Sequence, residues 1–137
     1  MDCIFCNIIK GKIPARKIIE TEKSLAFLDA FPLTKGHVLV IPKNHYTKIQ
    51  EMSKEDNTDL FEIVRILTNK IENLFSPSLI AVHNGRESGQ EVPHVHVHII
   101  PRSTSDGAGP VHSMFEKRPK FTNDEFDQIA KTLRDEN

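Results

Sequence analysis

The chain has 137 residues, 38% of them hydrophobic, which is enough for one domain with a core, and its formal net charge is −1. This near-neutral charge argues against binding to bulk nucleic acid or to a membrane surface, both of which attract basic chains. No apolar run approaches the roughly 20 residues of a membrane span, and Asp2 and Cys3 interrupt any signal-peptide pattern, so a cytoplasmic protein is expected.

The only two cysteines, Cys3 and Cys6, form a Cys-x-x-Cys pair near the N-terminus. A structural disulfide is disfavoured in a reducing cytosol, so the pair favours metal binding or a redox role. The alternative is that both are small buried residues at a chain end. A tetrahedral zinc site with two cysteines needs two further ligands, which this spacing alone does not identify.

The pattern of apolar residues predicts five short strands and one long helix. In the third strand, His37, Leu39 and Ile41 alternate with other residues and therefore share one face. Ser53, followed closely by acidic residues, is the predicted N-cap of a helix whose apolar residues then recur every three or four positions. The strands are predicted over residues 17–20, 25–28, 37–41, 79–82 and 94–100.

The C-terminal part differs from the rest in composition. Residues 103–121 are rich in Ser, Gly and Pro and predict a loop, and Thr122 starts a capping-box sequence that predicts a helix over 122–137. We therefore expect one α+β domain over 1–137, with its core in 1–102, an antiparallel sheet, one long helix and a C-terminal helix.

The most informative stretch holds three alternating histidines, His94, His96 and His98, separated by aliphatic residues. In a strand, residues i, i+2 and i+4 lie on one face, so the three imidazoles are expected to point the same way. Imidazole can serve as nucleophile, acid, base or metal ligand near neutral pH. Nucleophilic chemistry is the favoured interpretation, and the alternatives are an exposed strand face or a metal site using all three rings.

This stretch resembles the motif His-φ-His-φ-His-φ-φ, with φ hydrophobic, of the histidine triad (HIT) family. Further blocks match that family in the same order, and the resemblance covers residues 3 to 102. The matching blocks are residues 94–100 followed by Pro101-Arg102, residues 36–45, residues 26–29 and residues 84–90, together with Cys3, Cys6 and Ile13-Pro14.

The resemblance implies a five-stranded sheet that continues across a homodimer into ten strands. It also implies covalent catalysis in which His96 attacks a phosphorus atom and forms a nucleotidyl-histidine, which water then hydrolyses. By the same match, His98 binds the phosphate and helps the leaving group depart, His37 assists positioning, and His94 orients its neighbours or holds zinc.

Nucleotide-binding residues follow from the same match. Asp29 is expected to accept hydrogen bonds from the ribose hydroxyls, with the alternative that it is a turn residue before Pro32. His96 and His98 are expected to contact the phosphate. The remaining implied residues are Phe5, Ile8, Ile13 and Phe27 around a purine base, and Asn84, Gly89 and Gln90 around the phosphates.

Members of the family with this N-terminus also imply the missing metal ligands. Zinc would be bound by Cys3 and Cys6 together with His45 and His94, which makes a Cys₂His₂ set. The zinc is expected to be structural.

Two positions depart from the family pattern. Where well-known animal members have Ser or Thr, this chain has Glu91, whose carboxylate would repel a phosphate, so we hypothesise that it recognises a cationic leaving group. Where the family more often has an amide, this chain has His83, which is either a phosphate ligand or simply fills that place.

By the same resemblance, the complete triad with His37 implies a hydrolase of purine nucleoside phosphoramidates or similar AMP-linked compounds. A dinucleoside polyphosphate hydrolase would share these residues and differ mainly in its leaving-group contacts. A nucleotide-sensing module with incidental catalysis, and a zinc-dependent redox module using Cys3 and Cys6, are the alternatives from other classes.

Overall fold

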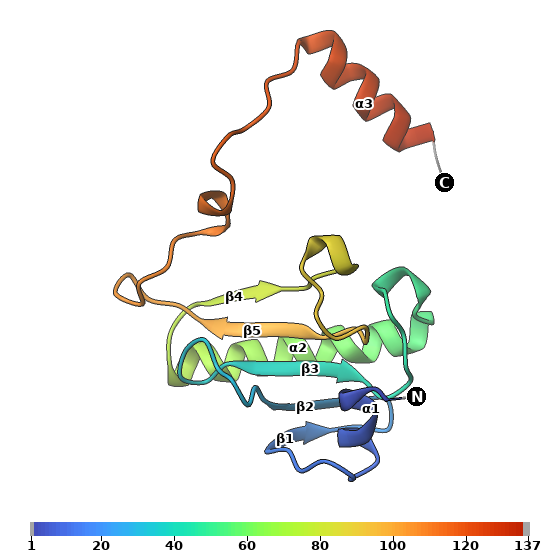
Figure 1. Ribbon diagram of the computed structural model, residues 1–137, viewed down its shortest axis with the longest axis vertical. Helices are drawn as coiled ribbons and strands as arrows, with labels where there is room; N and C mark the ends of the chain where they lie inside the picture. Colours follow the sequence, from blue (N-terminus) through green and yellow to red (C-terminus); the bar gives the residue numbers. More distant parts are fainter. Residues whose placement is uncertain (1, 136–137) are drawn as a thin grey trace. The chain divides into compact units, whose positions relative to one another are not determined.

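The computed structural model describes residues 2–135, which fall into two compact units. The first unit ends at Asp106 and contains a five-stranded antiparallel sheet of order β1-β2-β3-β5-β4 (Figure 1). This confirms the predicted α+β architecture. The strands are β1 (Lys17–Glu20), β2 (Ser24–Leu28), β3 (Val38–Pro42), β4 (Ser78–Ala81) and β5 (Val97–Pro101).

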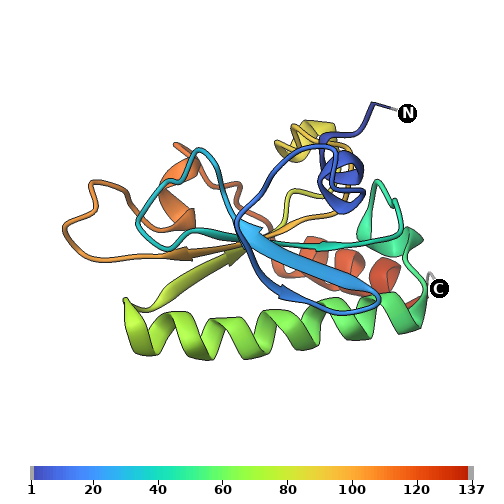
Figure 2. The ribbon, with the colours of Figure 1, turned by 90° about the horizontal axis from the view of Figure 1, so that it is seen from below.

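The long helix α2 (Lys54–Leu74) lies along one face of the sheet (Figure 2). It begins as predicted, because the Ser53 hydroxyl accepts a hydrogen bond from the Asp56 amide at 3.1 Å. Its apolar stripe is buried against alternate residues of the strands and forms the larger core. The buried residues of this core are Ala26, Val38, Val40, Leu60, Ile63, Val64, Leu67, Ile71, Val95, Val97 and Ile99.

The opposite face of the sheet is covered by a short helix, α1 (Ile4–Ile9), which the sequence did not predict (Figure 2). Six residues are too few to show a helical period, so only the tertiary contact reveals it. Cys3 is its N-cap, with Sγ 3.4 Å from the Cys6 amide. The second core is formed by Cys3, Phe5, Ile8, Leu25, Phe27, Leu39 and Ile41.

The predicted start of the last strand was wrong by three residues. Residues 94–96 precede β5, because the His94 amide donates back to the Val92 carbonyl at 2.8 Å around Pro93. The Val95 amide then donates to the Tyr46 carbonyl at 2.8 Å, in a loop beyond the end of β3. The first two histidines therefore sit where the chain enters the sheet, and only His98 lies within a strand.

The second unit begins at Gly107 and contains the short helix η3 (Val111–Met114) and α3 (Asn123–Asp135). The predicted capping box is present: the Thr122 amide donates to the Glu125 carboxylate at 2.9 Å, and the Glu125 amide donates to the Thr122 hydroxyl at 3.1 Å. Residues 136 and 137 of the predicted helix lie outside the described residues. Within the part of the chain that is described, no helix has the length and apolarity needed to cross a membrane.

Candidate functional site

The aliphatic residues and the histidines of the motif alternate, and they lie on opposite sides of the sheet. Val95, Val97 and Ile99 enter the core beneath α2, as the motif predicted. His94 and His96 are buried at 0% and 6% exposure, and their rings contact Phe5 of α1 on the other side of the sheet. The ring centroids of His96 and His98 are 5.0 Å apart. Residues 94–98 thus bring the imidazoles together as one group.

The hydrogen bond made by one ring nitrogen fixes the tautomer of His96. Its Nδ1 lies 2.7 Å from the carbonyl oxygen of His94, and since a carbonyl can only accept, Nδ1 carries the proton. Nε2 therefore keeps its lone pair. Burial lowers the pKa of His96, and the charges of Asp29 and Glu91 oppose that effect only in part. A neutral ring with a free Nε2 lone pair is the form required of a nucleophile.

A chain of hydrogen bonds fixes His37 and His98. The Leu33 amide donates to Nδ1 of His37 at 3.0 Å, so the neutral His37 ring has its proton on Nε2. That Nε2 lies 3.0 Å from Nδ1 of His98 and 3.5 Å from a carboxylate oxygen of Asp29. His98 therefore accepts at Nδ1 and carries its own proton on Nε2.

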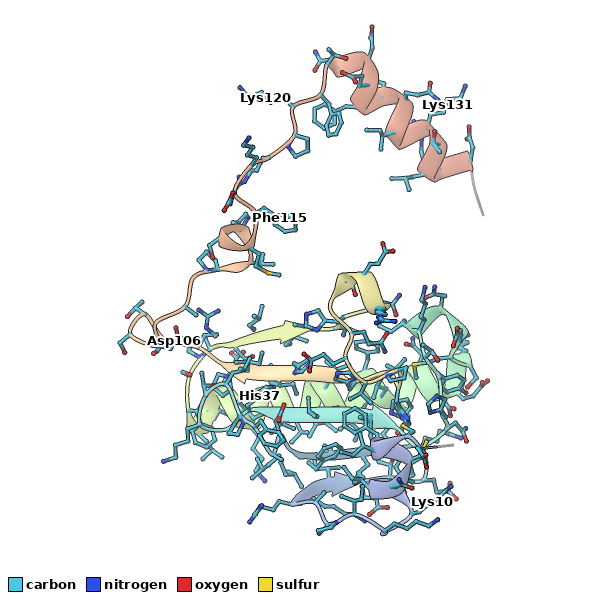
Figure 3. The ribbon with its side chains drawn as sticks, in the orientation of Figure 1. Lys10, His37, Asp106, Phe115, Lys120 and Lys131 are labelled. Atoms are coloured by element: carbon cyan, nitrogen blue, oxygen red, sulfur yellow. The ribbon has the colours of Figure 1, made fainter. Side chains whose placement is uncertain are left out.

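Both rings of this pair are held neutral. Burial, together with the neighbouring imidazoles, lowers the pKa of His98 to about 4. Burial also lowers the pKa of His37, which immediately precedes β3 (Figure 3) although the third strand was predicted to include it, and Asp29 opposes this shift. Asp29, His37 and His98 lie close enough to hold a metal ion. The tautomers argue against that use, because Nε2 of His37 is protonated and offers no lone pair.

Asp29 has two functions in the loop before β3. One carboxylate oxygen accepts from the Phe31 amide at 2.8 Å, as expected of a turn residue. The other faces His37, beside the histidine group. Its turn role and a contact with ribose hydroxyls are therefore compatible.

The four apolar residues assigned to the base pocket are gathered in the second core. Phe5, Ile8 and Phe27 are buried there, and the rings of Phe5 and Phe27 meet edge to face at 5.7 Å. Ile13 packs on the same cluster while still partly exposed. The structure places this apolar cluster directly against the rings of His94 and His96, through Phe5.

The loop between β4 and β5 is held in shape by two amide side chains. Asn84 accepts from the Ile49 amide at 2.9 Å and donates to Gln50 at 2.9 Å. Gln90 accepts from the Gly85 amide and donates to the Thr47 carbonyl, both at 2.8 Å. Both side chains tie this loop to the segment after β3. Their contact with a phosphate stays a prediction.

The role of His83 was left open by the sequence, as either a phosphate ligand or a residue that fills the place of an amide. His83 follows β4, and its ring centroid lies 5.8 Å from that of His98. Ala81 pairs with His98 in the antiparallel ladder, so two residues further along, His83 reaches the level of His96. Period-two alternation over 81–83 was the signal that could have placed His83 on the face of the histidines.

The predicted metal ligands come together beside the triad. The ligand atoms of Cys3, Cys6, His45 and His94 all lie within 4.8 Å of one another. Nδ1 of His94 is 3.1 Å from Nδ1 of His45, 3.5 Å from Sγ of Cys3 and 3.6 Å from Sγ of Cys6. A zinc tetrahedron has edges of about 3.4 Å between two nitrogens and about 3.5 Å between nitrogen and sulfur, so the donor set fits zinc.

The tautomer of His94 also suits a metal ligand. Its Nε2 donates to the Pro42 carbonyl at 2.8 Å, which leaves the Nδ1 lone pair directed at the two sulfurs. Burial lowers the pKa of His94 to about 4, so the ring is neutral. These four residues can hold a metal ion.

Known proteins are similar to this chain in both sequence and fold. The HIT domain matches residues 10–105. Adenosine 5'-monophosphoramidase from Schizosaccharomyces pombe is 47% identical over 108 residues, which cover 77% of this chain and 78% of that protein. A HIT family protein of known crystal structure from Bacillus subtilis is 36% identical, with a TM-score of 0.87, over 98% of this chain and 96% of its own. A zinc-bound histidine triad family protein from Mycobacterium smegmatis is 28% identical, with a TM-score of 0.72, over 98% of this chain and 94% of its own. With the family match spanning well over half of its length, the chain belongs to the HIT domain family.

Proposed function

We propose that this protein hydrolyses purine nucleoside phosphoramidates, or similar AMP-linked compounds, through a nucleotide covalently bound to His96. The observation that carries the proposal is the bond from Nδ1 of His96 to the His94 carbonyl, which leaves a lone pair on Nε2. The name of the S. pombe relative, a monophosphoramidase, supports the substrate class.

The reaction then has two displacement steps. Nε2 of His96 attacks the phosphorus atom, and the bond from phosphorus to the leaving group breaks. Water next attacks the same phosphorus atom, the bond to Nε2 breaks, and the nucleoside monophosphate is released. The proton on Nε2 of His98 is suited to donate a hydrogen bond to a phosphate oxygen as negative charge develops there.

The nucleotide would occupy the surface around the triad. Asp29 is assigned to the ribose hydroxyls, since its carboxylate lies beside His37. The base is assigned to the apolar cluster of Phe5, Ile8, Ile13 and Phe27, and the phosphates to His96, His98 and the loop of Asn84, Gly89 and Gln90. Gly89 has φ +110°, a conformation that favours glycine and lets backbone amides approach an anion.

We also propose that Cys3, Cys6, His45 and His94 hold zinc, as the donor set and the zinc-bound relative suggest. When bound, the ion would cross-link chain segments that are far apart in sequence. It would take no part in the reaction. Both thiols must be reduced to serve as ligands, which is consistent with a cytoplasmic location. A homodimer joined through its sheets remains part of the proposal.

Intact-mass analysis after brief mixing with adenosine 5'-phosphoramidate tests the mechanism. The native protein should gain the mass of one adenylyl group transiently, whereas His96→Ala should gain none. His112→Ala, a histidine substitution in the second unit, is the matched control and should behave like the native protein.

The other outcomes separate the alternatives. Faster turnover of diadenosine polyphosphates than of phosphoramidates would favour the polyphosphate hydrolase. Nucleotide binding without turnover of either compound would overturn the enzyme proposal and favour a sensing module.

A further inference from the structure

His83 lies among the reacting groups but has no assigned role. Its ring is half-buried, meets the His98 ring edge to face at 77° between planes, and adds to the charges that act on His96 and His98. Among the described residues, no hydrogen-bond partner is found for either of its ring nitrogens. A half-buried imidazole with free nitrogens can exchange protons with solvent and with a bound ligand.

The backbone makes room for this ring. Gly89 has φ +110°, and a Cβ atom at that position would lie 3.0 Å from Cδ2 of His83. The loop that is expected to wrap the phosphates therefore closes directly on the imidazole of His83. A substrate phosphate held by that loop would lie beside His83 and His98, whose rings meet edge to face.

The proton that the leaving group needs in the proposed reaction does not come from His37 or His98. An amine expelled from phosphorus must take up a proton to leave as a stable product. The neutral rings of His37 and His98 each have one proton, and losing it would create an imidazolate. These rings are suited to donate hydrogen bonds rather than to transfer a proton.

We propose that His83 is a catalytic residue of this reaction, protonating the departing amine and later accepting a proton from the attacking water. This inference rests on the proposed function. In the first step, Nε2 of His96 bonds to phosphorus, the P–N bond breaks, and its electron pair takes the proton of the His83 imidazolium. In the second step, water bonds to phosphorus, the P–Nε2 bond breaks, and the water proton returns to the now neutral His83. The protonation state is thereby restored after each cycle.

The test compares two leaving groups on the same His83→Asn protein. An N-alkyl phosphoramidate of AMP expels an amine that needs a proton, whereas adenosine 5'-phosphosulfate expels sulfate, which does not. The measured quantity is the single-turnover rate at which the adenylyl group appears on His96, with enzyme in excess. This first step excludes the later attack by water, which both substrates share.

We expect His83→Asn to slow adduct formation from the phosphoramidate by about 100-fold or more, and from the phosphosulfate by no more than about threefold. Added imidazole should restore the phosphoramidate rate of His83→Ala without changing its phosphosulfate rate. His112→Asn, the same substitution in the second unit, should leave both rates unchanged.

Equal slowing of both substrates would overturn the proposal and assign His83 a structural role, and so would no slowing of either. The phosphosulfate rate also reports whether the variant is folded. If the native protein forms no adduct from either substrate, the proposed function itself fails. If the native protein forms the adduct but His83→Asn slows both substrates alike, only the assignment of His83 is wrong.

Discussion

Nδ1 of His96 donates a hydrogen bond of 2.7 Å to the backbone carbonyl of His94. The ring of His94 is oriented the other way, with Nε2 donating to the Pro42 carbonyl and Nδ1 facing Cys3 and Cys6. The two histidines therefore hold opposite tautomers although they lie two residues apart. The backbone of a candidate metal ligand thus orients the candidate nucleophile, which links the two sites through one residue.

These hydrogen bonds predict the tautomer of each ring. At pH 7.5, long-range ¹H–¹⁵N correlation spectra should show His96 protonated on Nδ1, and His37 and His98 protonated on Nε2. His112, which lies in the second unit, is the internal reference for a ring outside this network. A proton on Nδ1 of His98 would contradict the chain of bonds that begins at the Leu33 amide.

Acid should destabilise the fold partly through His98. Its pKa is about 4 in the folded protein against 6.5 as the reference value, so between these pH values the unfolded chain binds a proton that the folded protein does not. The associated stability is complete above pH 6.5 and is lost as the pH falls toward 4. Between pH 7 and pH 4.5, the free energy of unfolding should therefore fall by about 1 to 2 kcal/mol less in His98→Gln than in the native protein. This figure allows for the partial exposure of the ring.

Urea unfolding of both proteins at the two pH values measures how much stability each loses in acid. Release of any bound metal at low pH affects both proteins and cancels in the comparison. An equal loss of stability in the two proteins would show that His98 titrates normally in the folded state.

The strands and the long helix were predictable because their signals are local. Period-two alternation defined the third strand, and the Ser53 cap with its apolar stripe defined α2. Helix α1 was missed because six residues carry no period, and its stability comes from Phe5 and Ile8 packing on the sheet. Pairing across the sheet depends on residues far apart in the sequence. The Val95 amide bonds to a loop after β3 and not to a strand, so the start of the last strand could not be predicted.

The same distinction applies to the site. The triad pattern identified the face that bears His96 and His98, since alternate residues of an extended segment share a face by geometry alone. His83 follows a different strand, β4, and its place near His98 depends on the register between β4 and β5. The side chains of Asn84 and Gln90 make loop-to-loop hydrogen bonds that a sequence does not show, and their contact with the phosphates stays a prediction.

Removal of one cysteine should remove the metal. Cys6→Ser replaces a thiolate ligand with a hydroxyl, and the remaining three donors should not retain zinc through purification. If zinc is supplied at about 1,000 times its dissociation constant, its loss lowers the free energy of unfolding by about 4 kcal/mol. Atomic emission should find about one zinc per native chain and none in Cys6→Ser. Chelator should lower the melting temperature of the native protein but leave that of the variant unchanged, whereas stoichiometric zinc in Cys6→Ser would refute the ligand assignment.

Gln90 is the buried one of the two amides that hold the loop before the triad. It is 7% exposed, accepts from the Gly85 amide and donates to the Thr47 carbonyl. In Gln90→Glu, a carboxylate oxygen would face the Thr47 carbonyl, so a hydrogen bond becomes a repulsion between two acceptors. We expect the free energy of unfolding to fall by about 2 to 3 kcal/mol at pH 7, with part of the loss recovered when the new carboxyl is protonated in acid.

Gln50→Glu provides the matched control for this substitution. Gln50 is exposed and accepts from the Asn84 amide, and a carboxylate oxygen can accept that bond equally well. Its effect on the free energy of unfolding should stay within about 0.5 kcal/mol. Urea unfolding of both variants at pH 7 distinguishes the two environments. Equal effects would mean that the buried pair of bonds at Gln90 contributes no more than a surface contact, and that the shape of the loop is maintained by other residues.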